Sequence, residues 1–288
     1  MLIDIHSHLD HCYFNDDLDR VIDNARKANV KVILTAGTNS EKNRESLEIA
    51  KRYDIVKACL GVYPVQYDNN NNHKNNKKNF NNKIQLKINK NKLKTINNNK
   101  LKNNNNEKLN IDEEIKSIEK NNKNIIAIGE VGLDYFWVKD NIDEQKELFG
   151  KMISLAEKLN KPIIVHSRKA EEDAVDILQS SKLKKIIMHC FSGKKSLVKK
   201  VVDNNWYLTI PTNVTKSFQF QDNAKIVPIT QLFCETDSPY LSPFSSKEKF
   251  QRNEPAFVLE AYKKVAGIKG MELKEVVNNI WMNWQKMF

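Results

Sequence analysis

Short apolar runs alternate along the chain with longer segments in which apolar residues recur every three or four positions. Eight of the short runs have the length of strands, and most of them are rich in β-branched residues, which is typical of strands in a parallel sheet. The first begins at residue 2, and the others span residues 30–38, 55–62, 125–133, 162–166, 185–189, 206–210 and 231–234. We therefore predict eight strands.

The segments between these runs have the spacing of amphipathic helices. The first helix is predicted over residues 16–29, where Leu18, Val21, Ile22 and Ala25 share a face. Further helices are predicted over residues 41–53, 111–121, 144–159, 170–178, 197–204, 218–227, 255–264 and 273–287. This regular alternation of strands and helices indicates βα units and a parallel sheet.

One stretch interrupts the alternation. Residues 69–110 contain nineteen asparagines and eleven lysines, and their scattered apolar residues have no sustained period. Such a composition cannot bury enough apolar surface to offset the entropy of ordering the chain. We expect a disordered, low-complexity insertion in the loop after the third strand; a polybasic arm with weak affinity for a polyanion is the alternative.

The number of strands favours a single α/β domain over residues 1–288, folded as a (β/α)8 TIM-type barrel. Without residues 69–110 the chain has 246 residues, close to the ~250 typical of that fold. A doubly wound open sheet is the alternative, but it normally has a glycine-rich phosphate loop after its first strand. His6, Ser7 and His8 occupy that position here, so the barrel is favoured.

Charge is concentrated in the predicted insertion. The formal net charge is +11, but residues 69–110 hold eleven lysines and a single acid, Glu107. The rest of the chain is therefore almost neutral, and its composition indicates no broad basic face for nucleic acid. Any recognition of phosphate has to come from a local site.

The remaining bulk features indicate a reducing compartment. The cysteines are scattered and form no C-x-x-C pair: Cys12, Cys59, Cys190 and Cys234. No run approaches the roughly 18 apolar residues of a membrane span, and no signal peptide is visible before the first strand. We expect a monomeric cytoplasmic protein without membrane contact, with the nucleus as the alternative compartment.

Candidate metal ligands stand at the ends of the predicted strands. In a barrel these carboxyl ends converge on one mouth, where active sites of this fold lie. Four histidines and two acids are placed there, at His6, His8, Glu130, His166, His189 and Asp237. Any one histidine is more often an ordinary pocket residue, but six such residues at convergent positions favour a metal site.

Six ligands exceed the needs of one tetrahedral zinc and suit two divalent cations, such as Mg²⁺, Mn²⁺ or Zn²⁺. Glu130 lies between the two histidine groups in chain order and is the natural shared ligand. Asp237 could bind a cation, accept a proton from the attacking water, or do both. Such a pair of cations serves phosphodiester and amide hydrolysis alike.

Three further residues are candidates for substrate binding. Arg168 has the planar fork that binds phosphate oxygens, although a helix-capping salt bridge would also explain it. Ser192 and Gly193 form a small turn before a predicted helix, where N–H groups could bind an anion.

Six motifs occur in order along the chain: HSHLD, GEVGLDY, VHSRKAEEDAVDIL, HCFSG, ETDSPYLSP and RNEP. This set resembles the TatD-like metal-dependent deoxyribonucleases, a branch of the amidohydrolase-type barrels. The resemblance implies hydrolysis of DNA phosphodiesters, often from a strand end. It also implies one metal held by His6, His8, Glu130 and Asp237, and a second held by Glu130, His166 and His189.

The resemblance places Arg168, Asp134, Tyr135 and Asn253 near a substrate pocket. Two positions depart from the family pattern: Tyr63 stands where the family usually has histidine, and Gln251 where it tends to have a basic residue. Two other functions stay open. One is a two-metal hydrolase of small-molecule ester or C–N bonds, and the other is a non-catalytic protein whose Asn/Lys arm binds nucleic acid.

Overall fold

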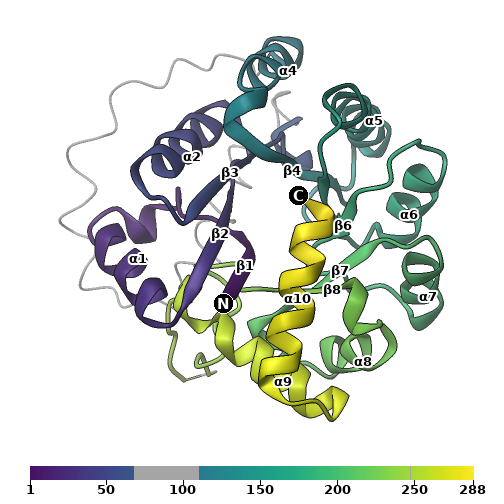
Figure 1. Cartoon of the computed structure of the whole chain (residues 1–288). Coiled ribbons are helices and arrows are strands. Elements are labelled where there is room, and N and C mark those ends of the chain that lie inside the picture. The colour runs from purple at the N-terminus through teal and green to yellow at the C-terminus, as the bar shows by residue number, and fades with distance from the viewer. Residues whose placement is uncertain (68–109, 247) are drawn as a thin grey trace.

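Eight parallel strands form the centre of the computed structural model, which describes residues 1–67, 110–246 and 248–288. They pair in sequence order from β1 to β8, with helices around them (Figure 1). The strands are β1 (Leu2–Ser7), β2 (Val30–Ala36), β3 (Val56–Leu60), β4 (Ile125–Asp134), β5 (Ile163–Arg168), β6 (Ile186–Met188), β7 (Tyr207–Pro211) and β8 (Leu232–Glu235). The predicted (β/α)8 barrel is confirmed.

The helices occupy the predicted segments. They are α1 (Leu18–Lys27), α2 (Ser40–Arg52), α4 (Ile111–Lys120), α5 (Ile142–Leu159), α6 (Glu171–Gln179), α7 (Lys195–Asp203), α8 (Phe218–Ile226), α9 (Val258–Lys269) and α10 (Leu273–Met287). Local chemistry sets their limits: Asn39 caps the first turn of α2 by accepting from the Lys42 N–H at 3.0 Å. Gly270, in the left-handed conformation at φ 61°, ends α9.

The segment before α9 differs from its prediction. A helix was expected from residue 255, but Pro255–Phe257 forms a 3₁₀ turn and α9 begins only at Val258. The predicted insertion at residues 69–110 lies outside the described residues except for Asn110. That side chain accepts from the Glu113 N–H at 3.2 Å and caps α4.

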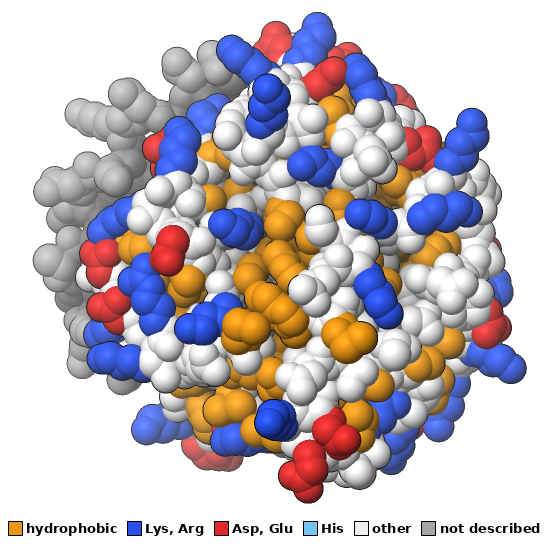
Figure 2. All heavy atoms as spheres, viewed as in Figure 1, with side chains coloured by type: hydrophobic (Ala, Val, Ile, Leu, Met, Phe, Trp, Pro, Cys, Tyr) orange, Lys and Arg blue, Asp and Glu red, His pale blue; other side chains and the backbone are white. Residues whose placement is uncertain are grey.

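Helix α10 closes one end of the barrel. It crosses in front of the strands in Figure 1, and the Asn283 amide donates to the Ile229 and Leu232 carbonyls at 2.8 Å each, where β8 begins. Figure 2 shows this face filled by apolar side chains near its centre, with lysine and arginine around them. The opposite end, where the strands finish, is therefore the end that can hold an open site. Within the described ranges, no helix is long and apolar enough to cross a bilayer.

The seam between β1 and β8 is held by side chains as well as by backbone. The Asp237 N–H donates to the His6 carbonyl at 3.0 Å, and the buried Asp4 carboxylate accepts from the Thr236 N–H and hydroxyl at 2.8 and 2.6 Å. Deeper in the seam, the Tyr262 hydroxyl both accepts from the Ile3 N–H and donates to the Ile3 carbonyl, at 3.1 Å each. The first strand is thereby fixed to the last.

Two strands have a local irregularity at a predicted ligand. The pairing of β1 with β2 shifts register between Asp4 and Ser7, around His6. The pairing of β4 with β5 shifts between Ile128 and Val131, around Glu130. Bulges of this kind re-aim side chains and are common beside active sites.

Candidate metal centre

The six predicted ligands come together at the mouth of the barrel. His6 lies in β1, Glu130 in β4 and His166 in β5, while the other three follow the ends of β1, β6 and β8. Two sets of donor atoms lie mutually within 4.8 Å: His6, Glu130 and His189, and His6, His8 and Asp237. His166 joins the first set through Glu130, because its Nδ1 lies 2.9 Å from that carboxylate.

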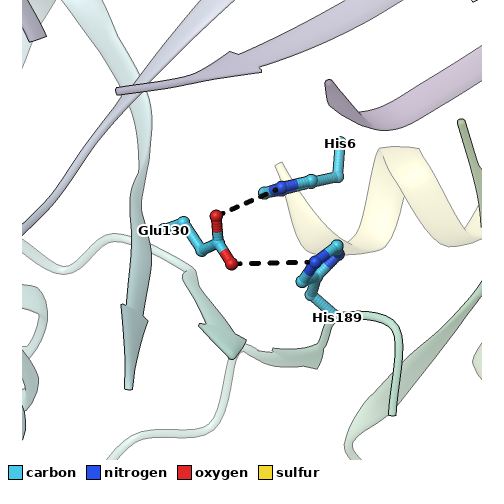
Figure 3. Close-up of side chains that lie close together, drawn as sticks. All are labelled: His6, Glu130 and His189. Atoms are coloured by element: carbon cyan, nitrogen blue, oxygen red, sulfur yellow. Dashed lines mark ion pairs between the residues drawn. The ribbon is translucent and has the colours of Figure 1, made fainter. Parts of the chain in front are cut away.

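Glu130 divides its two oxygens between two pairs of histidines. Oε2 lies 3.6 Å from Nε2 of His6 and 3.5 Å from Nε2 of His8. Oε1 lies 2.9 Å from Nδ1 of His166 and 3.7 Å from Nε2 of His189. Figure 3 shows one oxygen directed at His6 and the other at His189. A carboxylate in this position can bind two cations at once.

Asp237 completes the group around His6 and His8. Its Oδ1 lies 3.8 and 3.5 Å from their Nε2 atoms. These two nitrogens are 3.2 Å apart, a separation compatible with two imidazole ligands about 2 Å from one ion. Asp237 is also the more open acid, with 15% of its side chain exposed against 4% for Glu130.

The charges of this cluster fit divalent cations. In the part of the chain that the structure describes, every ion pair of Glu130 and Asp237 is made with a histidine. Buried carboxylates otherwise need a lysine, an arginine or a metal to offset the cost of desolvation. Imidazole nitrogens and carboxylate oxygens together are donors that zinc and manganese accept.

The acids shift the pKa values of the histidines. Burial alone would lower the pKa of His8, but Asp237 and Glu130 outweigh it and raise that pKa to about 10. His166 is likewise buried, and Asp134 and Glu130 raise its pKa to about 9. Burial favours the neutral form of Glu130, yet His166 and His6 hold its pKa well below the ordinary value.

These shifts predict proton release on metal binding. At neutral pH His8 and His166 are protonated in the metal-free protein, and a cation has to displace those protons. We expect the apparent affinity for Mn²⁺ to rise with pH up to about pH 10, where the pKa of His8 is reached. Calorimetric titration in buffers of different ionisation enthalpy measures the protons released. An affinity that stays constant over this range would contradict the expectation.

Hydrogen bonds outside the cluster orient its imidazoles. Nδ1 of His8 lies 3.1 Å from the Ala36 carbonyl, and Nδ1 of His189 lies 2.8 Å from Oε2 of Glu235. Each contact leaves Nε2 facing the cluster, which fixes the nitrogen available to a metal. The sequence analysis did not identify Glu235 as a partner of His189. The feature that could have indicated it is its place as the last residue of β8, at the same end of the barrel as the candidate ligands.

His166 is oriented the opposite way. Its Nε2 lies 2.9 Å from Asp134 Oδ2 and 3.0 Å from the Tyr63 hydroxyl oxygen. The Tyr63 hydroxyl donates its proton to Asp134 at 2.8 Å. Nδ1 is thus the nitrogen turned to Glu130. Tyr63 stands where the family usually has histidine. Here its hydroxyl contacts the nitrogen of His166 that faces away from Glu130, and so helps to orient that candidate ligand.

Two residues expected near the substrate pocket, Asn253 and Tyr135, use their polar groups in hydrogen bonds within the protein. Asn253 is fully buried, and its amide donates to Thr212, Thr236 and Tyr240 at 2.7–2.9 Å. It ties together the loop that carries Asp237. The Tyr135 hydroxyl donates to Asp173 at 2.7 Å, which holds this part-buried side chain against α6.

The other expected substrate residues lie at the mouth. Arg168 is exposed there at the end of β5. Ser192 is also exposed, and its hydroxyl donates to Glu171 at 2.7 Å, an acid that would disfavour an anion. Gly193 is buried, and a side chain at this position would meet the Phe191 ring at 2.6 Å.

Comparison with known proteins agrees with this geometry. The chain is 30% identical to human deoxyribonuclease TATDN3 over 292 residues, covering 100% of this chain and 94% of the relative. It is 30% identical to the uncharacterized metal-dependent hydrolase YabD of Bacillus subtilis, covering 100% and 99%. The Escherichia coli TatD homologue YJJV shares its fold at a TM-score of 0.79, with 21% identity over 100% and 97% of the two chains. The family model for TatD related DNases matches residues 3–288, so the chain belongs to that family.

Proposed function

We propose that this protein is a deoxyribonuclease that hydrolyses DNA phosphodiester bonds from a strand end, using two divalent cations. One observation carries the proposal: each oxygen of Glu130 faces a separate pair of histidine nitrogens. Membership of the family and relatives called deoxyribonuclease and metal-dependent hydrolase support it. The protein is accordingly a hydrolase of ester bonds.

The side chains of the cluster would have three roles: binding the cations, accepting a proton and binding phosphate. His6, His8 and Asp237 would hold one cation, and His166 and His189 the other, with Glu130 shared. Bound cations of this kind lower the pKa of water and polarise a phosphoryl oxygen. Asp237 is the acid more accessible to solvent and would accept a proton from an attacking water. Arg168 would bind a phosphate oxygen beside the cluster.

The test is cleavage of end-labelled single- and double-stranded DNA by metal-depleted protein. We expect no cleavage with EDTA, recovery with at least one of Mn²⁺, Mg²⁺ and Zn²⁺, and single nucleotides as the first products. Internal fragments as first products would replace the exonucleolytic mode by an endonucleolytic one. Cleavage that survives EDTA would overturn the metal-dependent function.

A panel of carboxylic esters and amides under the same conditions is the matching control. Turnover of that panel with intact DNA would assign the cations to small-molecule hydrolysis instead. An unrelated nuclease contaminant is excluded by testing whether the activity and the protein elute together in two different chromatographic steps.

A further inference from the structure

An exposed arginine lies on an exposed aromatic ring beside the metal centre. The Arg168 Cζ is 3.9 Å from the centroid of the Phe136 ring and 5.3 Å from that of Trp137. The two rings meet edge to face at 4.9 Å, and 43% of Phe136 is exposed. We call Phe136, Trp137 and Arg168 the aromatic shelf.

The shelf is fixed to a metal ligand through one carboxylate. Oδ1 of Asp134 accepts from the Phe136 and Trp137 N–H groups at 2.9 Å each, while Oδ2 contacts Nε2 of His166. Arg168 follows His166 by two residues on β5. The shelf thus holds a set position relative to the candidate metal ligand His166, as a substrate subsite requires.

The exposed phenylalanines have a common location. In the described ranges they are Phe136, Phe218, Phe244 and Phe250, and all four lie in segments that follow the carboxyl ends of strands β4, β7 and β8. Scattered exposed apolar residues are normal. Of the four, Phe136 is the ring joined to a metal ligand, through the Asp134 carboxylate, and it is therefore the one placed to contact a substrate held by the cluster.

Aromatic rings and guanidinium planes next to a phosphate-cleaving centre suit one ligand chemistry. Nucleobases stack on both kinds of plane, whatever their sequence. In a duplex the faces of a base are covered by its neighbours, so only an unpaired or end nucleotide can stack in this way. The edge of a stacked guanidinium still carries N–H donors for a phosphate.

We propose that the aromatic shelf is a nucleobase-stacking subsite, which takes the unpaired base of a nucleotide next to the scissile phosphate while Arg168 binds a phosphate oxygen. This inference rests on the proposed function, because it needs a DNA substrate. It adds a specificity-determining residue, Phe136, that the family motifs did not single out.

The experiment compares oligonucleotides that differ by one abasic nucleotide, moved stepwise away from the labelled end. We expect the wild type to lose about tenfold in kcat/KM when the missing base is the one that stacks. Phe136→Ala should show a KM raised about tenfold on the intact oligonucleotide, with kcat little changed and no penalty for the abasic site. Phe136→Trp should restore the penalty.

Phe136→Leu and Phe218→Ala are the matched controls. Leucine still covers Arg168 but has no aromatic face, so it should behave like alanine if stacking is the cause. Phe218 is 82% exposed and follows β7, so its loss should leave the abasic penalty unchanged. An abasic penalty that is absent in the wild type, or equal in wild type and Phe136→Ala, would overturn the subsite.

Failure of the subsite is separable from failure of the proposed function. If the wild type leaves DNA intact with every cation, the deoxyribonuclease function has failed. The same oligonucleotides then report binding by fluorescence anisotropy with the cation present. Weaker binding of the abasic oligonucleotide by wild type, but not by Phe136→Ala, would still support the subsite. Equal binding, or none, would refute it.

Discussion

Glu130→Gln should reduce DNA cleavage by at least about 10³-fold while the barrel stays folded. Residues that only support a metal ligand typically cost 10–100-fold when they are changed, and Glu130 faces both pairs of histidines. An amide of the same shape preserves packing but cannot supply two anionic oxygens. Metal content by mass spectrometry, circular dichroism and kcat on labelled DNA measure the three effects separately.

Glu235→Gln is a well-matched control. Both acids are buried and both contact His189, Glu235 at Nδ1 and Glu130 at Nε2. We expect the Glu235 variant to lose only about 10–100-fold, because it orients a ligand without being one. Equal losses for the two variants, or full activity of Glu130→Gln, would contradict the assignment of Glu130 as the shared ligand.

Asp237→Asn should lower kcat by about 10²–10⁴-fold, the usual contribution of a positioned proton acceptor. Its carboxylate faces Nε2 of His6 and of His8 and is the more open acid of the cluster. The asparagine can still offer a neutral oxygen to a cation but cannot take a proton. We therefore expect cation binding to weaken less than turnover.

Saturating cation distinguishes the two roles of Asp237. If the variant recovers full activity at high Mn²⁺ concentration, the residue is a ligand alone and the proton goes elsewhere. If activity stays low when cation content is restored, as we expect, proton transfer is the function lost. His6→Ala should lose bound cation together with activity, unlike Asp237→Asn, whose activity we expect to stay low even when its cation content is restored.

The strands were predictable because a strand buried on both faces appears in the sequence as a continuous apolar run. Runs such as Ile163–Val165 and Ile186–Met188 are β-branched or apolar throughout, as strands enclosed by helices must be. The limits of the segment before α9 were less predictable. A proline at position 255 is compatible with either a 3₁₀ turn or the first turn of an α-helix.

The candidate ligands were predictable for a topological reason, since residues at strand ends of a barrel converge whatever their separation in sequence. Their outer partners were not, because a loop side chain can turn toward or away from the mouth. Tyr135 was expected at the substrate pocket, yet Phe136 is the exposed ring and Tyr135 bonds to Asp173. Asn253 turned inward in the same way.

The seam between β1 and β8 also bears on how the protein is made. His6 and Asp237 lie at opposite ends of the chain, and the contacts that join them involve Asp4, Thr236 and Tyr262. At 5–20 residues per second, ribosomal synthesis of these two ends is separated by roughly 10–50 s. During that interval the chain carries His6 and His8 without β8 and Asp237, to which the seam joins them in the finished barrel. The complete metal centre can form only after nearly all of the barrel has been translated.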